Sequence, residues 1–384
     1  MSKLEIIATS AFGLESILAN EIRNLGYDDL VVDNGKVTFT ADELAVARCN
    51  LWLRTAERVF LKVGEFDAKS FEELFENTKA LRWADYIPKD GSFPVSKAKS
   101  VRSKLFSLSD IQAIVKKAAV EKMKQRYNTE WFKETGPLYP IHVSFLKDRA
   151  TISIDTSGCG LHKRGYRKLN NEAPIKETLA AGLVLISKWK PDRELIDPLC
   201  GSGTIPIEAA MIGLNMAPGM KREFVSENWP LIPENVWNQA REEAMDLLDC
   251  DADFKVFGSD IDGEVLRSAR HNVKLFGLEN NIFFQRRPVS ELRSGKEYGC
   301  IICNPPYAKR LGELREIEKL YKDMGKVFMS MDTWSYFILT SHPDFQKLFG
   351  KKADKNRKLY NGRILCYYYQ YIGPNPYKRE HNNL

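Results

Sequence analysis

The chain contains 384 residues, of which 43% are hydrophobic and 11% aromatic, so it can form two or three packed domains, and the composition argues against wholesale disorder. No apolar run reaches the ~18 residues of a membrane span, and the opening residues MSKLEIIATSAFGLES lack the basic and apolar regions of a signal peptide. We therefore expect a cytoplasmic protein without a membrane partner. The net charge of +6 is too small to indicate a class of partner by itself.

Strand-like and helix-like patterns alternate over the first 60 residues. The patterns predict strands at 3–10 and 36–41 and helices at 13–26 and 41–54, and Gly26 is expected to end the first helix. This alternation is typical of a small α+β unit.

The same style continues to about residue 155. The patterns predict a strand at 59–68, helices at 70–81 and 109–127, and a β-hairpin over 139–158 that turns at residues 147–149. The α+β region is therefore expected to extend well beyond the first unit.

Two stretches of the chain are rich in Lys and Arg. Residues 95–126 contain nine of these cations against Asp110 and Glu121, and residues 351–363 form a second basic run. Basic clusters on a globular background indicate a polyanionic partner. A solvated helix face accounts for such a run equally well, so both interpretations stay open at this point.

The loop 158–174 combines glycines, basic residues and a tyrosine, and we place a domain boundary near it. A helix is predicted at 175–189. Beyond it, strand-like segments alternate with helices up to a terminal strand pair. This alternation predicts an α/β fold with a parallel, doubly wound sheet.

The first motif with chemical content is LIDPLCGSGTIPIEAAMIG, residues 195–213. A strand ends at Asp197, a tight turn contains Gly201 and Gly203, and a helix begins near Thr204. Glycines let a ligand approach the backbone closely, and a helix N-terminus offers free N–H groups to an anion. A plain strand–helix connection is the simpler alternative.

The second motif, VFGSDIDGEVL, ends a strand at Asp260. In doubly wound folds, an acidic residue at the end of the second strand accepts hydrogen bonds from ribose hydroxyls. The alternative is that Asp260 and Asp262 only cap the following helix, and capping is the expected role of Asp262.

The third motif, GCIICNPPY, follows the predicted fourth strand of this sheet. Ligands bind outside the carboxyl ends of such strands. The Asn304 side-chain oxygen and the Pro305 carbonyl provide two fixed acceptors, and Tyr307 adds an aromatic face. Together they are suited to a planar base with an exocyclic amine, whereas a simple Pro-rich turn explains only the prolines.

The seven cysteines indicate reduced thiols rather than a metal site. Cys300 and Cys303 lie three apart in a predicted strand, so they point to opposite faces of the sheet and cannot share a metal ion. We expect no bound metal.

DPLCGSGT, GSDID and NPPY, in this order, resemble the class I S-adenosylmethionine-dependent methyltransferases that act on amino nitrogens. The segments GLHKRGYR, APIKETLAAGLV, KLYNGRILCYYYQY and ATSAFGLESILANEIRNLG narrow the resemblance to the guanine-N2 RNA methyltransferases with a THUMP RNA-binding domain, in particular to the N-terminal half of the bifunctional bacterial 23S ribosomal RNA enzymes. The resemblance implies a ferredoxin-like unit at 1–60, a THUMP domain at 45–157 and a Rossmann-like methyltransferase domain at 165–384.

The resemblance also implies the cofactor, the partner and the roles of individual residues. The partner would be RNA, and large-subunit ribosomal RNA, free or in an assembling subunit, is the expected substrate. S-adenosylmethionine would be bound by Asp197, Cys200, Gly201, Ser202, Gly203, Thr204, Asp260, Ile261, Asp262 and Thr178. The target amine would be held by Asn304, Pro305, Pro306 and Tyr307. RNA phosphates would contact Lys97, Lys99, Arg102, Lys104, Lys116, Lys117, Lys163, Arg164 and Arg167.

The sequence departs from the family at Pro288, where an acidic residue near the cofactor's adenine is usual. We expect a neighbouring backbone group to replace that contact. Two other functions stay open. An adenine-N6 nucleic-acid methyltransferase would use the same NPPY motif. A catalytically silent RNA-binding or ribosome-assembly factor is motivated by Pro288, but the intact Asn304 and Asp260 argue against it.

Overall fold

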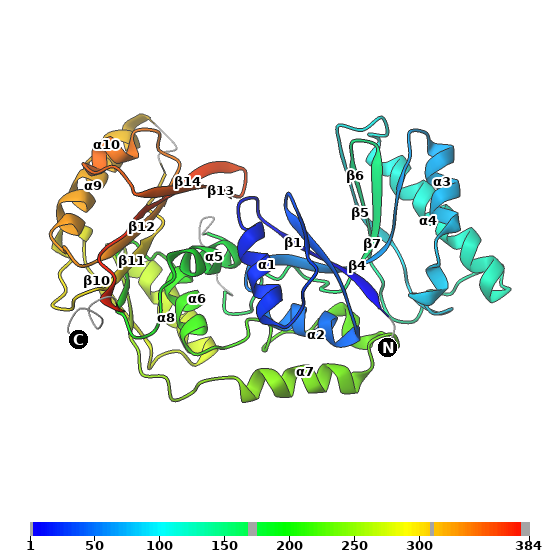
Figure 1. Ribbon diagram of the computed structural model, residues 1–384, viewed down its shortest axis with the longest axis horizontal. Coiled ribbons are helices and arrows are strands. Elements are labelled where there is room, and N and C mark those ends of the chain that lie inside the picture. Colours follow the sequence, from blue (N-terminus) through cyan, green and yellow to red (C-terminus); the bar gives the residue numbers. More distant parts are fainter. Residues whose placement is uncertain (1–2, 168–174, 308–310, 378–384) are drawn as a thin grey trace, which may run out of the picture. The chain divides into compact units, whose positions relative to one another are not determined.

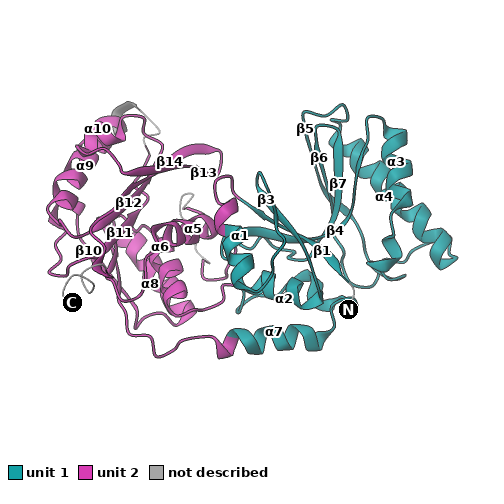
Figure 2. Ribbon diagram, viewed as in Figure 1, with its two compact units in different colours: residues 1–10, 18–161, 219–244 teal, residues 11–17, 162–218, 245–384 magenta. Residues whose placement is uncertain are grey.

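The computed structural model describes residues 3–167, 175–307 and 311–377, and these form two compact units (Figure 2). Residues 1–10, 18–161 and 219–244 make up the first unit. Residues 11–17, 162–218 and 245–384 make up the second. Each unit is built on one seven-stranded sheet (Figure 1).

The sheet of the first unit has the strand order β2-β3-β1-β4-β7-β6-β5. Its strands are β1 (Leu4–Ser10), β2 (Val31–Asp33), β3 (Lys36–Ala41), β4 (Ala56–Asp67), β5 (Val95–Val101), β6 (Ile141–Leu146) and β7 (Arg149–Asp155). The helices described with it are α1 (Glu15–Asn24), α2 (Glu43–Trp52), α3 (Phe71–Ala80), α4 (Leu108–Tyr127) and α7 (Glu234–Asp246), with short 3-10 turns η1 (Trp83–Asp85) and η2 (Val225–Asn228). Helix α1 itself begins in the segment that packs with the second unit.

Two regions that follow each other in the sequence, residues 1–60 and 60–155, share one sheet because strand β4 belongs to both. Its first half pairs with β1 over residues 56–61, and its second half pairs with β7 over residues 60–67. The predicted β-hairpin is β6 and β7, and its turn consists of Lys147 and Asp148, which both have positive φ as a tight two-residue hairpin requires.

Several features of the first unit were not predicted from the sequence, among them the strand β2 and the helix α7. Strand β5 pairs in parallel with β6 at the edge of the sheet, whereas the sequence analysis predicted no strand there. Residues 219–244 pack with this unit although the flanking sequence belongs to the other. Within that segment, Trp229 stacks on Tyr139 with ring centroids 4.6 Å apart, and its indole N–H donates to the Leu138 carbonyl at 2.9 Å.

The sheet of the second unit has the order β10-β9-β8-β11-β12-β14-β13. Its strands are β8 (Leu195–Asp197), β9 (Val256–Asp260), β10 (Ile282–Arg286), β11 (Cys300–Cys303), β12 (Ser335–Thr340), β13 (Lys355–Asn361) and β14 (Ile364–Tyr371). Its helices are α5 (Glu177–Ser187), α6 (Thr204–Gly213), α8 (Gly263–Phe276), α9 (Leu311–Met329) and α10 (Phe345–Phe349), with the 3-10 turn η3 (Val289–Glu291). Strands β8 to β12 are parallel and β14 is antiparallel to both its neighbours, so the predicted doubly wound sheet with a terminal strand pair is confirmed.

The two faces of this sheet bury separate hydrophobic clusters. Cys300 and Ile302 of β11 pack on the side of α5 and α6, whereas Ile301 and Cys303 pack on the side of α9. The two cysteines thus face opposite layers, as predicted. Within the described residues, the structure contains no group of three or more His, Cys, Asp or Glu side chains that could hold a metal ion.

The parallel order β9-β8-β11 decides where the sequence motifs meet. The carboxyl ends of these three neighbouring strands lie at one edge of the sheet, and they carry Asp260, Asp197 and Asn304. No helix in the described part of the chain is long and apolar enough to cross a bilayer.

Because α9 packs closely on α10, we expect a substitution of Gly325 to destabilise the protein strongly. A methyl group on Gly325 would collide with the backbone carbonyl oxygen of Phe349, which cannot move without shifting α10. We expect Gly325→Ala to lower the free energy of unfolding by about 3 kcal/mol in urea titrations. Gly295→Ala is the matched control because open space surrounds that site, and it should stay within about 0.5 kcal/mol of the parent. Equal midpoints for the two variants would contradict this packing.

Candidate functional site

The loop between β8 and α6 forms the centre of the candidate site. Gly203 caps α6 with a φ of +81°, and a Cβ atom there would come within 2.9 Å of the Phe284 ring. Gly201 also has a positive φ of +50°, but no described residue other than its chain neighbours comes within 4 Å of the position its Cβ would take. The backbone at Gly201 is therefore open to a ligand, while Gly203 lets α6 begin close to the sheet.

Asp260 fastens this loop to the next one. Its carboxylate accepts hydrogen bonds from the backbone N–H groups of Gly201 and Asp262, both at 3.0 Å. Since each carboxylate oxygen can accept more than one hydrogen bond, Asp260 retains capacity for ribose hydroxyls. Asp262 caps α8 by accepting from the Glu264 N–H at 2.8 Å, which is the capping role expected for it.

Asp197 lies beneath the loop and is only 1% exposed. Its carboxylate accepts from the Leu199 N–H at 3.1 Å, and no cation is paired with it among the described residues. Burial, followed by the nearby negative charge of Asp260, raises the pKa of Asp197 well above its ordinary value. A ligand that brings an ammonium group would relieve this unfavourable burial.

The other residues predicted to bind the cofactor differ in accessibility. Cys200 and Ser202 in the loop and Thr178 on α5 are buried, and the Ser202 hydroxyl has no hydrogen-bond partner in the described structure. Ile261, directly after Asp260, is 64% exposed. The exposed Ile261 side chain therefore offers an apolar surface beside the loop that a flat ring could cover.

Asn304 and Tyr307 contact each other at the end of β11. The Tyr307 hydroxyl donates to the Asn304 side-chain oxygen, and the Cys366 thiol of β14 lies 3.5 Å from the same hydroxyl. Burial raises the pKa of Tyr307, so the hydroxyl keeps its proton and stays a donor. Of the two prolines between them, Pro305 is buried and Pro306 is exposed.

The Tyr307 ring is less free than the sequence motif suggests. The ring packs against the hydrophobic cluster on the α5 and α6 side of the sheet, and its hydroxyl points to Asn304. The motif predicted that Tyr307 adds an aromatic face to a site suited to a planar base. The Tyr307 hydroxyl occupies one acceptor position of the Asn304 side-chain oxygen, and an amide oxygen can accept a second hydrogen bond.

The predicted RNA-binding residues of the first unit fall into two groups. Lys97, Lys99, Arg102 and Lys104 are exposed on β5 and the turn that follows it, and Lys117 is exposed on α4. Lys116 differs, because its ammonium pairs with Glu134 at 2.6 Å and sits 3.4 Å from the Phe93 ring centroid. Lys116 is therefore committed to packing within the unit.

The predicted RNA contacts of the second unit are corrected more strongly. Lys163 is exposed, but the Arg164 side chain is only 2% exposed and pairs with Glu208 of α6 at 3.4 Å. Arg167 is also largely buried, because its guanidinium pairs with Glu177 at 3.3 Å and donates to the Thr204 hydroxyl at 2.7 Å. Neither arginine is available to RNA phosphates in this structure.

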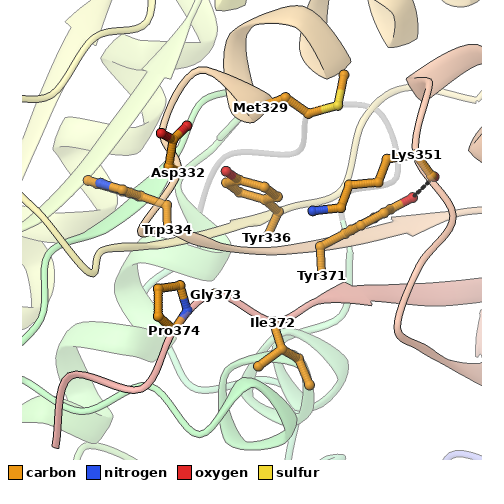
Figure 3. Close-up of a pocket in the computed structure, with 9 residues that line it drawn as sticks. All are labelled: Met329, Asp332, Trp334, Tyr336, Lys351, Tyr371, Ile372, Gly373 and Pro374. Carbon is orange, nitrogen blue, oxygen red and sulfur yellow. Dashed lines mark hydrogen bonds between the residues drawn. The ribbon is translucent and has the colours of Figure 1, made fainter. Parts of the chain in front are cut away.

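Two cavities lie in the second unit, and the larger of the two is away from the predicted site. One of about 390 Å³ is lined by Trp334 and Tyr336 at the start of β12 and by Tyr371 to Pro374 at the end of β14 (Figure 3). The Tyr371 hydroxyl closes one side of it by donating to the Lys351 carbonyl at 3.0 Å. Because β11 and β12 are parallel, the start of β12 lies at the sheet edge opposite Asn304. A second cavity of about 160 Å³ lies on the β9 and β10 strands around Phe257 and Phe283.

Comparison with known families matches three consecutive parts of the chain. Residues 164–370 match the RMKL-like methyltransferase domain, residues 5–60 match the RlmL ferredoxin-like domain, and residues 68–155 match the THUMP domain.

Individual proteins are similar along nearly the whole chain. A putative RNA methyltransferase of Bacillus subtilis, YpsC, is 50% identical over 97% of this chain and 96% of its own. The ribosomal RNA large subunit methyltransferase K/L of Syntrophotalea carbinolica is 33% identical over 94% of this chain, which spans only 53% of that longer protein. The solved structure of SMU.472, a putative methyltransferase complexed with SAH, is 44% identical with a TM-score of 0.93 over 98% of this chain and 99% of its own.

The raised pKa of Asp197 predicts how this residue affects stability. A carboxyl whose pKa is raised by folding contributes fully below the pKa of the unfolded chain, about 3.9, and stability is lost as the pH rises towards the folded pKa. We expect Asp197→Asn to melt at a higher temperature than the parent at pH 7, with the difference shrinking towards pH 4. Asp251→Asn, which removes an exposed carboxylate, is the control and should change the melting temperature little. A parent-like melting profile for Asp197→Asn across this range would show that Asp197 bears no such penalty.

Proposed function

The chain belongs to the RMKL-like methyltransferases, and we propose that it transfers a methyl group from S-adenosylmethionine to the exocyclic N2 amine of a guanine in RNA. The family resemblance inferred from the sequence motifs, with its ferredoxin-like and THUMP domains, is confirmed. For the finer assignment, 23S ribosomal RNA is the expected substrate, supported by similarity to a large-subunit ribosomal RNA methyltransferase.

The observation that carries the proposal is the position of Asn304 beside the glycine loop. Asn304 follows β11, and β11 pairs directly with β8, which leads into that loop. A methyl donor held over the loop and an amine held by Asn304 would therefore lie next to each other at the same edge of the sheet.

The residues of the loop suit the three polar parts of the cofactor. The first turn of α6, beginning at Thr204, offers N–H groups to its carboxylate, Asp197 would accept its ammonium, and Asp260 would accept its ribose hydroxyls. The open space at Gly201 and the unpartnered Ser202 hydroxyl fit a ligand at this place. When bound, S-adenosylmethionine supplies an electrophilic methyl group on a sulfonium.

At the adenine end, two neighbouring backbone positions offer no free N–H group. Ile261 would cover one face of the ring, but Pro288, at the start of η3, has no N–H to offer. The N–H of Arg287 is already donated to the Asp260 carbonyl at 3.0 Å. We therefore expect the ribose and amino acid parts to provide most of the specificity.

Asn304 and Pro305 would orient the target amine. A guanine amine is a poor nucleophile because its lone pair is delocalised into the ring, and N–H bonds to the Asn304 oxygen and the Pro305 carbonyl would aim that lone pair. Tyr307 holds the Asn304 amide in place through its hydroxyl. Because the methylated nitrogen is cationic and loses its proton readily, orientation and electrostatics suffice without a His or Cys base.

The exposed cations of β5 and its following turn would position the RNA. Contacts to phosphates set the register of a nucleic acid without reading its sequence. To reach Asn304 the target base would have to leave its stack. In this proposal the first unit binds the RNA and the second unit carries out the reaction.

The chemistry can be tested on protein-free RNA from a strain that lacks this protein. We expect incubation with S-adenosylmethionine to produce N2-methylguanosine, measured by mass spectrometry of the digested nucleosides. Asn304→Ala should reduce the rate by about 10²-fold or more, and Tyr307→Phe by about tenfold because only the orienting hydroxyl is lost.

The identity of the product separates the alternatives. N6-methyladenosine in place of N2-methylguanosine would reassign the chain to adenine methylation. An unchanged rate in Asn304→Ala would overturn the proposed role of this motif. If no product formed on protein-free RNA or on immature ribosomal subunits, while the protein still bound RNA, the silent binding factor would be favoured.

The β5 surface predicts a specific change in the salt dependence of RNA binding. If Lys97 and Lys99 contact phosphates, Lys97→Ala/Lys99→Ala should weaken binding and reduce the slope of log Kd against log salt by about 1.4 to 1.8. Lys319→Ala/Lys322→Ala removes the same charge from exposed positions on α9 and is the matched control. Equal slopes for the two double variants would place the RNA elsewhere.

A further inference from the structure

A network of charged side chains lies at the start of helices α5 and α6, next to the glycine loop. The Arg167 guanidinium donates to the Thr204 hydroxyl at 2.7 Å and to the Ile175 carbonyl at 3.2 Å, and it pairs with the Glu177 carboxylate at 3.3 Å. Thr204 is the first residue of α6 and Glu177 the first residue of α5. One side chain therefore fixes the first residues of both helices relative to each other.

Helix α6 has a second attachment one turn further along. Glu208 is fully buried, accepts from the Tyr166 hydroxyl at 3.0 Å and pairs with Arg164. Thr204 and Glu208 are four residues apart, so they lie on the same face of α6. The short segment 164–167 thus holds this face at two points, and the point nearer the glycine loop depends on Arg167.

The positive charge of Arg167 lies at the N-termini of α5 and α6, where a cation is electrostatically unfavourable. A helix N-terminus carries partial positive charge, so a cation beside it is unfavourable unless an anion is present. Glu177 provides one negative charge, but burial raises its pKa, and its second carboxylate oxygen has no hydrogen-bond partner in the described structure. The Nε of Arg167 is likewise buried, and it has no hydrogen-bond partner among the residues that the structure describes. This arrangement favours the arrival of a further anion at the start of α6.

We propose that Arg167 is a positioning residue for the amino acid half of the cofactor. It holds Thr204 so that the first N–H groups of α6 face the cofactor's carboxylate, and its charge adds to the positive potential there. The inference rests on the proposed function, which puts that carboxylate at the glycine loop. The adenine and ribose parts of the cofactor would contact Ile261 and Asp260 in the loop after β9. Their binding should not be affected by Arg167.

The test compares two ligands that share the adenosine part. S-adenosylhomocysteine carries the amino acid group, whereas 5′-methylthioadenosine lacks it. In calorimetric titrations we expect Arg167→Met to weaken binding of S-adenosylhomocysteine at least about tenfold and to leave binding of 5′-methylthioadenosine within about twofold. Arg315→Met, an exposed arginine on α9, is the matched control and should change neither affinity.

Two further variants separate position from charge. Arg167→Gln can still donate to Thr204 without a charge, so it should lose less affinity than Arg167→Met, and it replaces that variant if Arg167→Met does not fold. Thr204→Val removes the partner hydroxyl. If Arg167 acts through Thr204, the double variant Arg167→Met/Thr204→Val should bind S-adenosylhomocysteine no more weakly than Arg167→Met alone.

The outcomes distinguish this inference from the proposed function. Equal losses for both ligands, no loss for either, or additive effects in the double variant would overturn the role of Arg167 while leaving the cofactor site intact. Failure of the parent protein to bind either ligand would instead overturn the proposed function, and the inference with it.

Discussion

The two hydrogen bonds that Asp260 accepts from the backbone N–H groups of Gly201 and Asp262 hold the candidate site together. They join the loop after β8 to the loop after β9, strands that are neighbours in the sheet. The first loop then presents the N-terminus of α6, and the second presents the exposed Ile261. One carboxylate thus fixes the spacing between the surfaces that would take the two ends of the cofactor.

Around this contact the second unit buries several charged side chains. Asp197 is buried without a cation among the described residues, and Arg164 and Arg167 are paired with Glu208 and Glu177 between α5 and α6. Buried charges are costly and rarely add stability over apolar residues of the same size. Because these buried charges gather beside the glycine loop, a role in a polar binding site explains them better than a contribution to folding stability.

The first unit differs in that its exposed cations lie on the edge strand of a single continuous sheet. Strand β4 belongs to both halves of its sheet, so the edge strand β5 continues a single hydrogen-bonded layer. The cations at Lys97 and Lys99 stand on that edge, where they are exposed, while Lys116 is used in packing. A basic stretch of sequence therefore divides into a surface part and a structural part.

The sequence by itself determined the features that depend on neighbouring residues. The strand–loop–helix pattern around Gly201 and Gly203, the Asp262 cap and the opposite facing of Cys300 and Cys303 could be read from local spacing, and the motifs indicated the family by their resemblance to known proteins. Only the tertiary structure decided the strand β5, the packing of residues 219–244 with the first unit, the pairing of Arg164 and Arg167 with acids on α5 and α6, and the contact of Tyr307 with Asn304 and with Cys366 of β14. The physical reason is that an exposed loop arginine and a buried one have the same local sequence signature. Which of them occurs depends on partners brought from elsewhere in the chain, as Glu208 is brought to Arg164 from 44 residues away.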